Sequence, residues 1–201
     1  LFFRKYSCWN KKKVREEDRL IAFQDEAGFQ LTANVGCTYA PKGQTPVLVA
    51  DAKFYTKVSV SAIISIQGDL FYDVRANETF KSMATRRLLE HTAKDFKKRL
   101  FLLWDNAPIH RSQIIKDFLQ EQQDKKTKHD VYVSFIPTYS PELNPIEQLW
   151  GYIKNVLLKN TFCKTAKELK EKVIRSLEIV KKDKELIKSF FRHKDCCYIL
   201  S

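Results

Sequence analysis

The chain has 201 residues, of which 44% are hydrophobic and 12% aromatic, and its formal net charge at pH 7 is +12. That length suits one domain with a sizeable core and is short for two, while no apolar run approaches the roughly 18 residues of a membrane helix and no signal peptide opens the chain. The five cysteines are odd in number and lack CxxC spacing, which argues against a zinc site or a disulfide framework and favours a reducing, intracellular setting.

The spacing of apolar residues predicts strands in the first part of the chain and alternating helices and strands after it. The expected strands cover residues 19–24, 29–33, 37–41, 57–66, 70–74, 100–104 and 131–136. The expected helices cover residues 77–96, 109–122, 145–159 and 165–190. This order predicts a mixed α/β domain with an open sheet and helices packed on it, and in such sheets polar chemistry gathers at strand ends.

The positive charge is concentrated at the two ends of the chain. Residues 1–24 hold seven Lys/Arg and three acids, residues 25–150 hold 16 and 15, and residues 151–201 hold 13 and six, which gives +4, +1 and +7. A solvated helical face explains a lysine-rich tail, and so does a surface that binds the phosphates of a polyanion. Charge alone leaves both interpretations open.

Two apolar runs end on an aspartate. The stretch FLLWDNAPIH places Asp105 directly after an expected strand, and LIAFQ runs into DEAG at Asp25 in the same way. Taken singly, each favours a local role, because aspartate commonly shapes turns and caps helices, and Pro108 suits a first helical turn.

A third carboxylate, Glu147, lies in TYSPELNPIEQLWGYIKN. Asn144 is a good N-cap there, Pro145 suits the first helical position, and Glu147 falls where it could close a capping box. As a set, however, Asp25, Asp105 and Glu147 could converge at one edge of the sheet. Crowded carboxylates repel one another unless cations neutralise them, and two Mg²⁺ ions held by carboxylates can cleave a phosphodiester without a covalent protein intermediate.

Four blocks in order, DEAGFQL, VGCTYAPKGQTPV, LLWDNAPIH and FIPTYSPELNPIEQLWGYIK, resemble the catalytic domain of mariner-type DDE transposases, in the bacterial and archaeal insertion-sequence branch. The resemblance covers about residues 19–160. It implies a ribonuclease H-like fold, a mixed sheet flanked by helices, with Asp25, Asp105 and Glu147 as the catalytic triad. It also implies DNA strand cleavage and joining with Mg²⁺ or Mn²⁺, two ions being expected.

DNA is the expected partner, as transposon ends and as target, with a homodimer in the active complex and no membrane association. The expected location is the nucleoid in the cytoplasm of a prokaryote, or the nucleus of a eukaryote. The expected layout is a basic leader at 1–18, the catalytic domain at 19–160, and a basic helical C-terminal extension of that domain at 161–201.

Two features depart from the family pattern. Asp105 and Glu147 are separated by 41 residues, more than the mid-thirties spacing usual in the superfamily, and the surplus is assigned to a surface loop around 120–130. The family also carries N-terminal helix-turn-helix modules, which nothing here resembles. Because the chain starts at Leu1 and not at Met, it is compatible with a fragment of a longer protein whose modules were removed or are encoded elsewhere.

Five side chains are predicted as contacts to DNA phosphates: Lys42, His110, Lys154, Lys164 and Lys167. For His110, a packed or exposed histidine is an equal alternative. Glu26 could compete for metal but should face away from Asp25 if the strand persists, and Glu142 is expected at the surface. Trp150 and Tyr139 could stack on bases, although helix–sheet packing is the preferred reading of Trp150.

Two other functions remain open. The first keeps the fold and the metal cluster but makes the protein a resolvase or a structure-specific nuclease, against which the block PTYSPELNPIE argues. The second is a non-catalytic transposase remnant that only binds DNA, against which the intact Asp25, Asp105 and Glu147 argue. Metal-dependent cleavage, and the product formed on transposon-end DNA, would separate the three.

Overall fold

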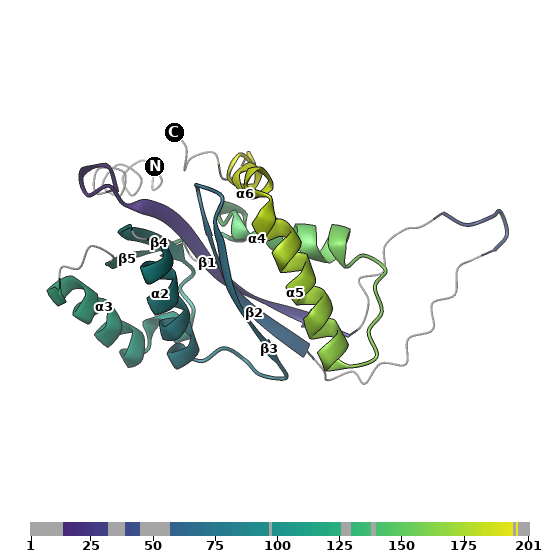
Figure 1. Cartoon of the computed structure of the whole chain (residues 1–201), viewed down its shortest axis with the longest axis horizontal. Helices are drawn as coiled ribbons and strands as arrows, with labels where there is room; N and C mark the ends of the chain where they lie inside the picture. The colour runs from purple at the N-terminus through teal and green to yellow at the C-terminus, as the bar shows by residue number, and fades with distance from the viewer. Residues whose placement is uncertain are drawn as a thin grey trace.

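A five-stranded sheet forms the centre of the molecule in the computed structural model, which describes residues 14–31, 39–44, 57–96, 98–125, 130–137, 140–194 and 196 (Figure 1). The strands are β1 (Leu20–Gln30), β2 (Lys57–Ser65), β3 (Leu70–Ala76), β4 (Leu100–Trp104) and β5 (Val131–Phe135). They lie side by side in the order β3-β2-β1-β4-β5.

The sheet is mixed. β1, β2 and β3 form an antiparallel meander, whereas β4 pairs parallel with β1, and β5 parallel with β4. All residues of β2 except Lys57 are buried, so helices must cover both faces of the sheet. Its run of β-branched and small residues suits that position between two paired neighbours.

Helices pack on both faces (Figure 1). They are α2 (Ser82–Phe96), the 3₁₀ turn η1 (Pro108–Arg111), α3 (Gln113–Lys125), the 3₁₀ turn η2 (Pro141–Leu143), α4 (Ile146–Tyr152), the π-helix η3 (Ile153–Leu157), α5 (Ala166–Lys182) and α6 (Lys184–Phe191). α2 and α3 lie on one side of the sheet, and α4, α5 and α6 on the other. The mixed α/β sheet flanked by helices that the sequence predicts is therefore confirmed.

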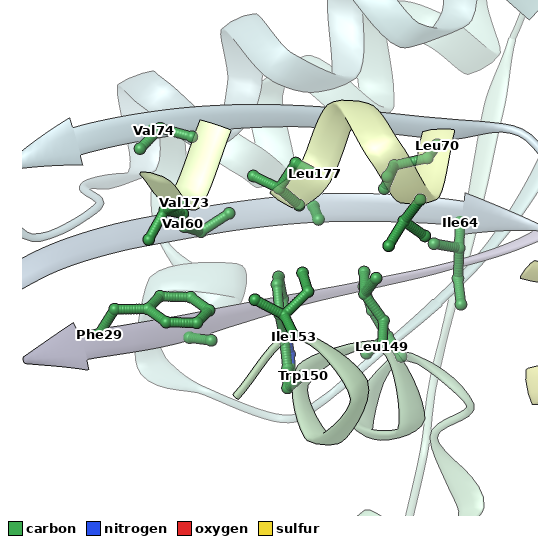
Figure 2. Packing of buried hydrophobic residues seen from close by; sticks show 14 of the residues in the cluster. Phe29, Val60, Ile64, Leu70, Val74, Leu149, Trp150, Ile153, Val173 and Leu177 are labelled. Atoms are coloured by element: carbon green, nitrogen blue, oxygen red, sulfur yellow. The ribbon is translucent and has the colours of Figure 1, made fainter. Parts of the chain in front are cut away.

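Each face of the sheet has its own hydrophobic core. On the α4–α5 face, Phe29 and Val60 from the strands meet Leu149, Val173 and Leu177 from the helices (Figure 2). On the α2–α3 face, the core is built from a second set: Leu20, Ala22, Leu89, Leu102, Trp104, Ile115 and Phe118, among others. Because residues alternate along β1, neighbouring side chains of this strand enter different cores.

Several element boundaries differ from the sequence predictions. The helix expected from residue 77 begins at Ser82, because Asn77 turns the chain with a positive φ of 57° and its N–H donates to the Lys57 carbonyl. Residues 39–41 are not in a strand, and the other residues of the hairpin expected after residue 31 lie outside the described part of the chain.

The two C-terminal helical predictions each cover two elements. The helix expected at 145–159 is α4 followed by the π-helix η3. The helix expected at 165–190 breaks at Asp183, which ends α5 and accepts a hydrogen bond from the Leu186 N–H to start α6. A side chain that bonds its own neighbouring backbone competes with helix continuation, which explains the break.

The C-terminal extension is part of the same packed body as the sheet, because α5 and α6 contribute Val173, Leu177 and Phe191 to the core on their face. Residues 1–13 of the basic leader lie outside the described part of the chain, and the domain boundaries stay predictions. None of the described helices is long and apolar enough to span a membrane.

Candidate metal and catalytic site

Asp25 of β1 and Asp105, directly after the neighbouring strand β4, lie at the same height along the two strands. The parallel register pairs Phe23 of β1 with Leu103 of β4, so each aspartate lies two residues beyond this pair. Asp105 directly follows the end of β4, as predicted. Asp25 does not end its strand, because β1 continues to Gln30 by pairing with β2; the expected strand end at this position is wrong.

Asp25 faces the side of the sheet that α4 covers, and Trp150 of this helix binds it. The Trp150 indole N–H donates to Asp25 Oδ2 at 3.0 Å. Burial raises the pKa of Asp25 to about 7; the Trp150 bond lowers this pKa and the nearby Glu147 carboxylate raises it. The carboxyl group is therefore costly to ionise unless a cation enters beside it.

Asp105 is held through one carboxylate oxygen. The Ala107 N–H donates to Asp105 Oδ1 at 3.0 Å, and His110 Nδ1 lies 2.7 Å from the same oxygen. The His110 hydrogen bond is the largest cause of a lowered pKa for Asp105. Half of the side chain is exposed, and within the described residues its second oxygen, Oδ2, receives no hydrogen bond.

His110 is buried behind Asp105. Its ring stacks on Trp104 with centroids 4.3 Å apart and planes 4° from parallel, and Nε2 lies 3.5 Å from Glu26 Oε1. Burial lowers the pKa of His110, but its contacts with Asp105 and Glu26 outweigh burial and raise this pKa to about 9. The His110 side chain has 0% exposure, so the structure shows the packed alternative, and the predicted contact of His110 with DNA stays a prediction.

Glu26 lies on the opposite face of β1 from Asp25, as strand alternation predicts. Its Oε1 accepts hydrogen bonds from Gln24 Nε2 at 2.6 Å and Ser61 Oγ at 3.3 Å. With these partners and His110, Glu26 joins β1 to β2 and to the loop after β4. Glu26 therefore stabilises the elements that carry the two aspartates, and it is not among the residues that line their pocket.

Glu147 lies on the first turn of α4 and does not cap this helix through its side chain. Instead, Asn144 Oδ1 accepts a hydrogen bond from the Ile146 N–H at 3.3 Å. Partial burial raises the pKa of Glu147, and Lys154 lowers it. Three residues after Glu147, Trp150 bonds Asp25, so one short helix positions both the glutamate and the indole.

The three carboxylates line one pocket of about 330 Å³, together with Asn106 and Asn144. In the described part of the chain, no three His, Cys, Asp or Glu side chains stand close enough to form a finished metal site. The donor set nevertheless suits Mg²⁺ or Mn²⁺, which bind carboxylate oxygens and keep waters as further ligands. A divalent cation would also offset the repulsion between Glu147 and Asp25.

The basic residues predicted to contact DNA are placed as follows. Lys42, Lys164 and Lys167 are exposed, the last two around the start of α5. Lys154 lies in the π-helix with Nζ 5.4 Å from the centroid of the Phe29 ring, close enough to Glu147 to affect its pKa. Their contact with DNA stays a prediction.

The aromatic residues and Glu142 complete the comparison with the sequence predictions. Trp150 is buried and packs edge-on against Phe29 with centroids 6.2 Å apart, so helix–sheet packing is confirmed and base stacking is not available to it. The sequence analysis did not predict the hydrogen bond from the Trp150 indole to Asp25. Glu142 is exposed, as expected, and Tyr139 lies outside the described residues.

Comparison with known proteins places this geometry in a family. A family model described as "DDE superfamily endonuclease" matches residues 20–170. A curated relative, the insertion element IS630 uncharacterized 39 kDa protein of Shigella sonnei, is 24% identical over 163 residues, covering 80% of this chain. The chain spans 45% of the length of this relative.

Solved structures of Mos1 transposase share the fold. The Mos1 strand transfer complex aligns with a TM-score of 0.70 at 19% identity, over 98% of this chain and 58% of that one. The catalytic domain of Mos1 mariner transposase aligns with a TM-score of 0.56 at 14% identity, over 92% and 90% of the two chains. The ribonuclease H-like fold and the mariner-type resemblance are thus confirmed. With a family model matching most of its length, the chain belongs to the DDE superfamily endonucleases.

Proposed function

We propose that this chain is the catalytic domain of a transposase that cleaves DNA strands and joins them to a target, using Mg²⁺ or Mn²⁺ held by Asp25, Asp105 and Glu147. The observation that carries the proposal is the shared pocket of these three carboxylates. Each comes from a different element, β1, the loop after β4, and α4, which is the arrangement that the family motifs imply.

Divalent ions bound there would activate the attacking oxygen and stabilise the leaving oxygen of a phosphodiester. The other side chains of the protein orient the carboxylates that would bind these ions. Trp150 fixes one oxygen of Asp25, and His110 with the Ala107 N–H fixes one oxygen of Asp105. Fixed donors of this kind reduce the reorganisation that metal binding needs.

DNA as substrate agrees with the positive charge of the chain and with two similar structures, the strand transfer complex and the paired end complex of Mos1. Lys42, Lys154, Lys164 and Lys167 remain the proposed phosphate contacts. Lys172 is a weaker candidate, because its ammonium donates to the Phe162 carbonyl at 2.9 Å and pairs with Glu168 at 3.0 Å. The homodimer and the location on the nucleoid or in the nucleus stay predictions.

The function is tested by the products formed from DNA that carries the ends of the element. We expect no cleavage in EDTA, and in Mg²⁺ or Mn²⁺ both free 3′ ends and molecules in which those ends are joined to a second DNA. Gel analysis with one labelled end separates these species. Joining needs activation of a 3′ oxygen at the same metal site that first activates water.

Two other results would decide against the proposal. Metal-dependent cutting of branched DNA without any joining identifies a resolvase or a structure-specific nuclease. DNA binding without cutting at any concentration of Mg²⁺ or Mn²⁺ identifies a non-catalytic remnant, despite the intact carboxylates.

A further inference from the structure

Glu26 is the second acid of the stretch DEAG, and the carboxylate pocket does not use it. Asp25 lines that pocket, whereas Glu26 lies on the opposite face of β1 and is not among the lining residues. Its side chain is only 23% exposed. Removing most of a carboxylate from water costs free energy unless hydrogen bonds or charges offset the loss. The contacts of Glu26 therefore indicate what this acid does.

Two buried side chains fix the Glu26 carboxylate from the side of β2. Gln24 Nε2 donates to Glu26 Oε1 at 2.6 Å, and Ser61 Oγ donates to the same oxygen at 3.3 Å. Ser61 lies directly opposite Glu26 in the register of β1 and β2, and Gln24 Nε2 also donates to Ser61 Oγ at 3.0 Å. Gln24 and Ser61 are fully buried. The packed sheet therefore gives one oxygen of Glu26 a defined place.

His110 lies between Glu26 and Asp105, with one ring nitrogen toward each carboxylate. Nδ1 is 2.7 Å from Asp105 Oδ1, and Nε2 is 3.5 Å from Glu26 Oε1. The second separation is longer than an ordinary hydrogen bond, and Nε2 is buried without a hydrogen-bond partner in the described part of the chain. Glu26 is therefore the group that offers this nitrogen a negative charge at close range.

The His110 ring has little freedom to turn. It stacks on Trp104 with centroids 4.3 Å apart and planes 4° from parallel, and its side chain has no exposed surface. The backbone before it is also held, because the Ile109 carbonyl accepts a hydrogen bond from the Ser82 hydroxyl at 3.3 Å. His110, like Glu26, does not line the carboxylate pocket. Both side chains can therefore affect the pocket only through a residue that does line it.

Asp105 is that residue. Its Oδ1 accepts hydrogen bonds from His110 Nδ1 and from the Ala107 N–H, which lies at 3.0 Å, while no described residue donates to Oδ2. Two donors on one oxygen fix the orientation of the carboxylate and leave the other oxygen for a cation. A carboxylate that is already oriented loses less rotational freedom when the cation binds.

We propose that Glu26 and His110 are positioning residues for the metal ligand Asp105, with Glu26 acting through His110. The contacts run from β2 through Glu26 and His110 to the carboxylate that follows β4. The inference rests on the proposed function, because it gives both residues a role at a metal site. Replacing the outer partners of metal ligands typically weakens metal binding by about 10- to 100-fold.

The affinity for Mn²⁺, measured by calorimetry, tests the proposal without any DNA cleavage. His110→Phe keeps a ring that can stack on Trp104 but has no donor, and it should weaken Mn²⁺ binding by about 30-fold. His110→Asn places an amide donor near the position of Nδ1 and should recover part of this loss. Glu26→Gln acts one residue further from the cation and should weaken binding by about tenfold. Urea unfolding in EDTA establishes that each variant is folded.

The double variant separates positioning from general destabilisation. If Glu26 acts through His110, adding Glu26→Gln to His110→Phe should weaken Mn²⁺ binding no further, whereas independent effects would multiply. Two exposed residues provide matched controls, His91 on α2 and Glu171 on α5. His91→Phe and Glu171→Gln should leave the affinity for Mn²⁺ within about twofold of wild type.

Three results would overturn the inference: losses that multiply in the double variant, wild-type affinity in both single variants, or equal losses in the controls. In each of these cases the unmodified protein still binds Mn²⁺, so the proposed function stands. If the unmodified protein does not bind Mn²⁺ at all, the metal site fails, and the proposed function fails together with the inference.

Discussion

Replacing Asp105 with asparagine should reduce the rate of metal-dependent DNA cleavage by at least about 1,000-fold, because stabilisation of the reacting oxygens by bound metal is worth several kcal/mol. The asparagine keeps the size of the side chain, and its amide oxygen can still accept the Ala107 N–H bond. It loses the negative charge with which the carboxylate attracts a divalent cation, so the amide is a much weaker ligand. DNA binding should remain, since the side chain carries no positive charge for phosphates.

Single-turnover cleavage of end-labelled DNA measures this effect, with Asp117→Asn as control. Asp117 is an exposed aspartate of α3 that accepts a hydrogen bond from Gln113 Nε2 on the same helix, so its replacement should leave the rate unchanged. Calorimetry should show weaker Mn²⁺ binding for the Asp105 variant alone. Cleavage within a few-fold of wild type by Asp105→Asn would remove Asp105 from the catalytic site.

Asparagine at position 25 should stabilise the metal-free protein at alkaline pH. In the folded state the pKa of Asp25 is raised to about 7 from 3.8, so between these values the folded protein holds a proton that the unfolded chain has lost. Stability then falls as pH rises through this window. From pH 5 to pH 8, the advantage of Asp25→Asn over wild type should grow by about 3 kcal/mol.

Urea unfolding in EDTA at several pH values measures the free energy of unfolding for both proteins. Asp105→Asn is the control: the pKa of Asp105 is lowered in the folded state, so this group is ionised in both states over the same range and its variant should show no such growth. Mn²⁺ should stabilise the wild type most at alkaline pH, because it binds the ionised carboxylates. A difference between Asp25→Asn and wild type that is flat with pH would show that Asp25 is not desolvated.

Local sequence signals predicted the elements that depend on neighbours along the chain. The alternation of side chains in β2 and the apolar run of β4 predicted both strands correctly. The predicted turn at 67–69 also forms, around Gly68, whose φ is +86°. Gly68 packs so closely on α6 that an added Cβ would lie 2.5 Å from the Lys184 carbonyl, a contact that only the tertiary fold creates.

The side chains that hold the candidate catalytic carboxylates in place do so through contacts that the sequence analysis did not predict. Trp150 and Asp25 are separated by 125 positions, and no local pattern tells whether a buried indole N–H will find a carboxylate. His110 reaches Asp105 because a 3₁₀ turn, and not an α-helix, follows β4. The positions of Asp25, Asp105 and Glu147 after apolar runs and at a helix start, together with the motif resemblance, predicted the triad residues, but only the fold shows that they line one pocket.

Anomalous X-ray diffraction from crystals soaked in Mn²⁺ tests the central claim most directly. We expect anomalous density in the pocket between Asp25, Asp105 and Glu147, with α4 shifted so that the Glu147 carboxylate contacts an ion, and loss of this density in Asp105→Asn crystals. Mn²⁺ bound elsewhere at millimolar concentration, with Glu147 turned away from both aspartates, would contradict the account.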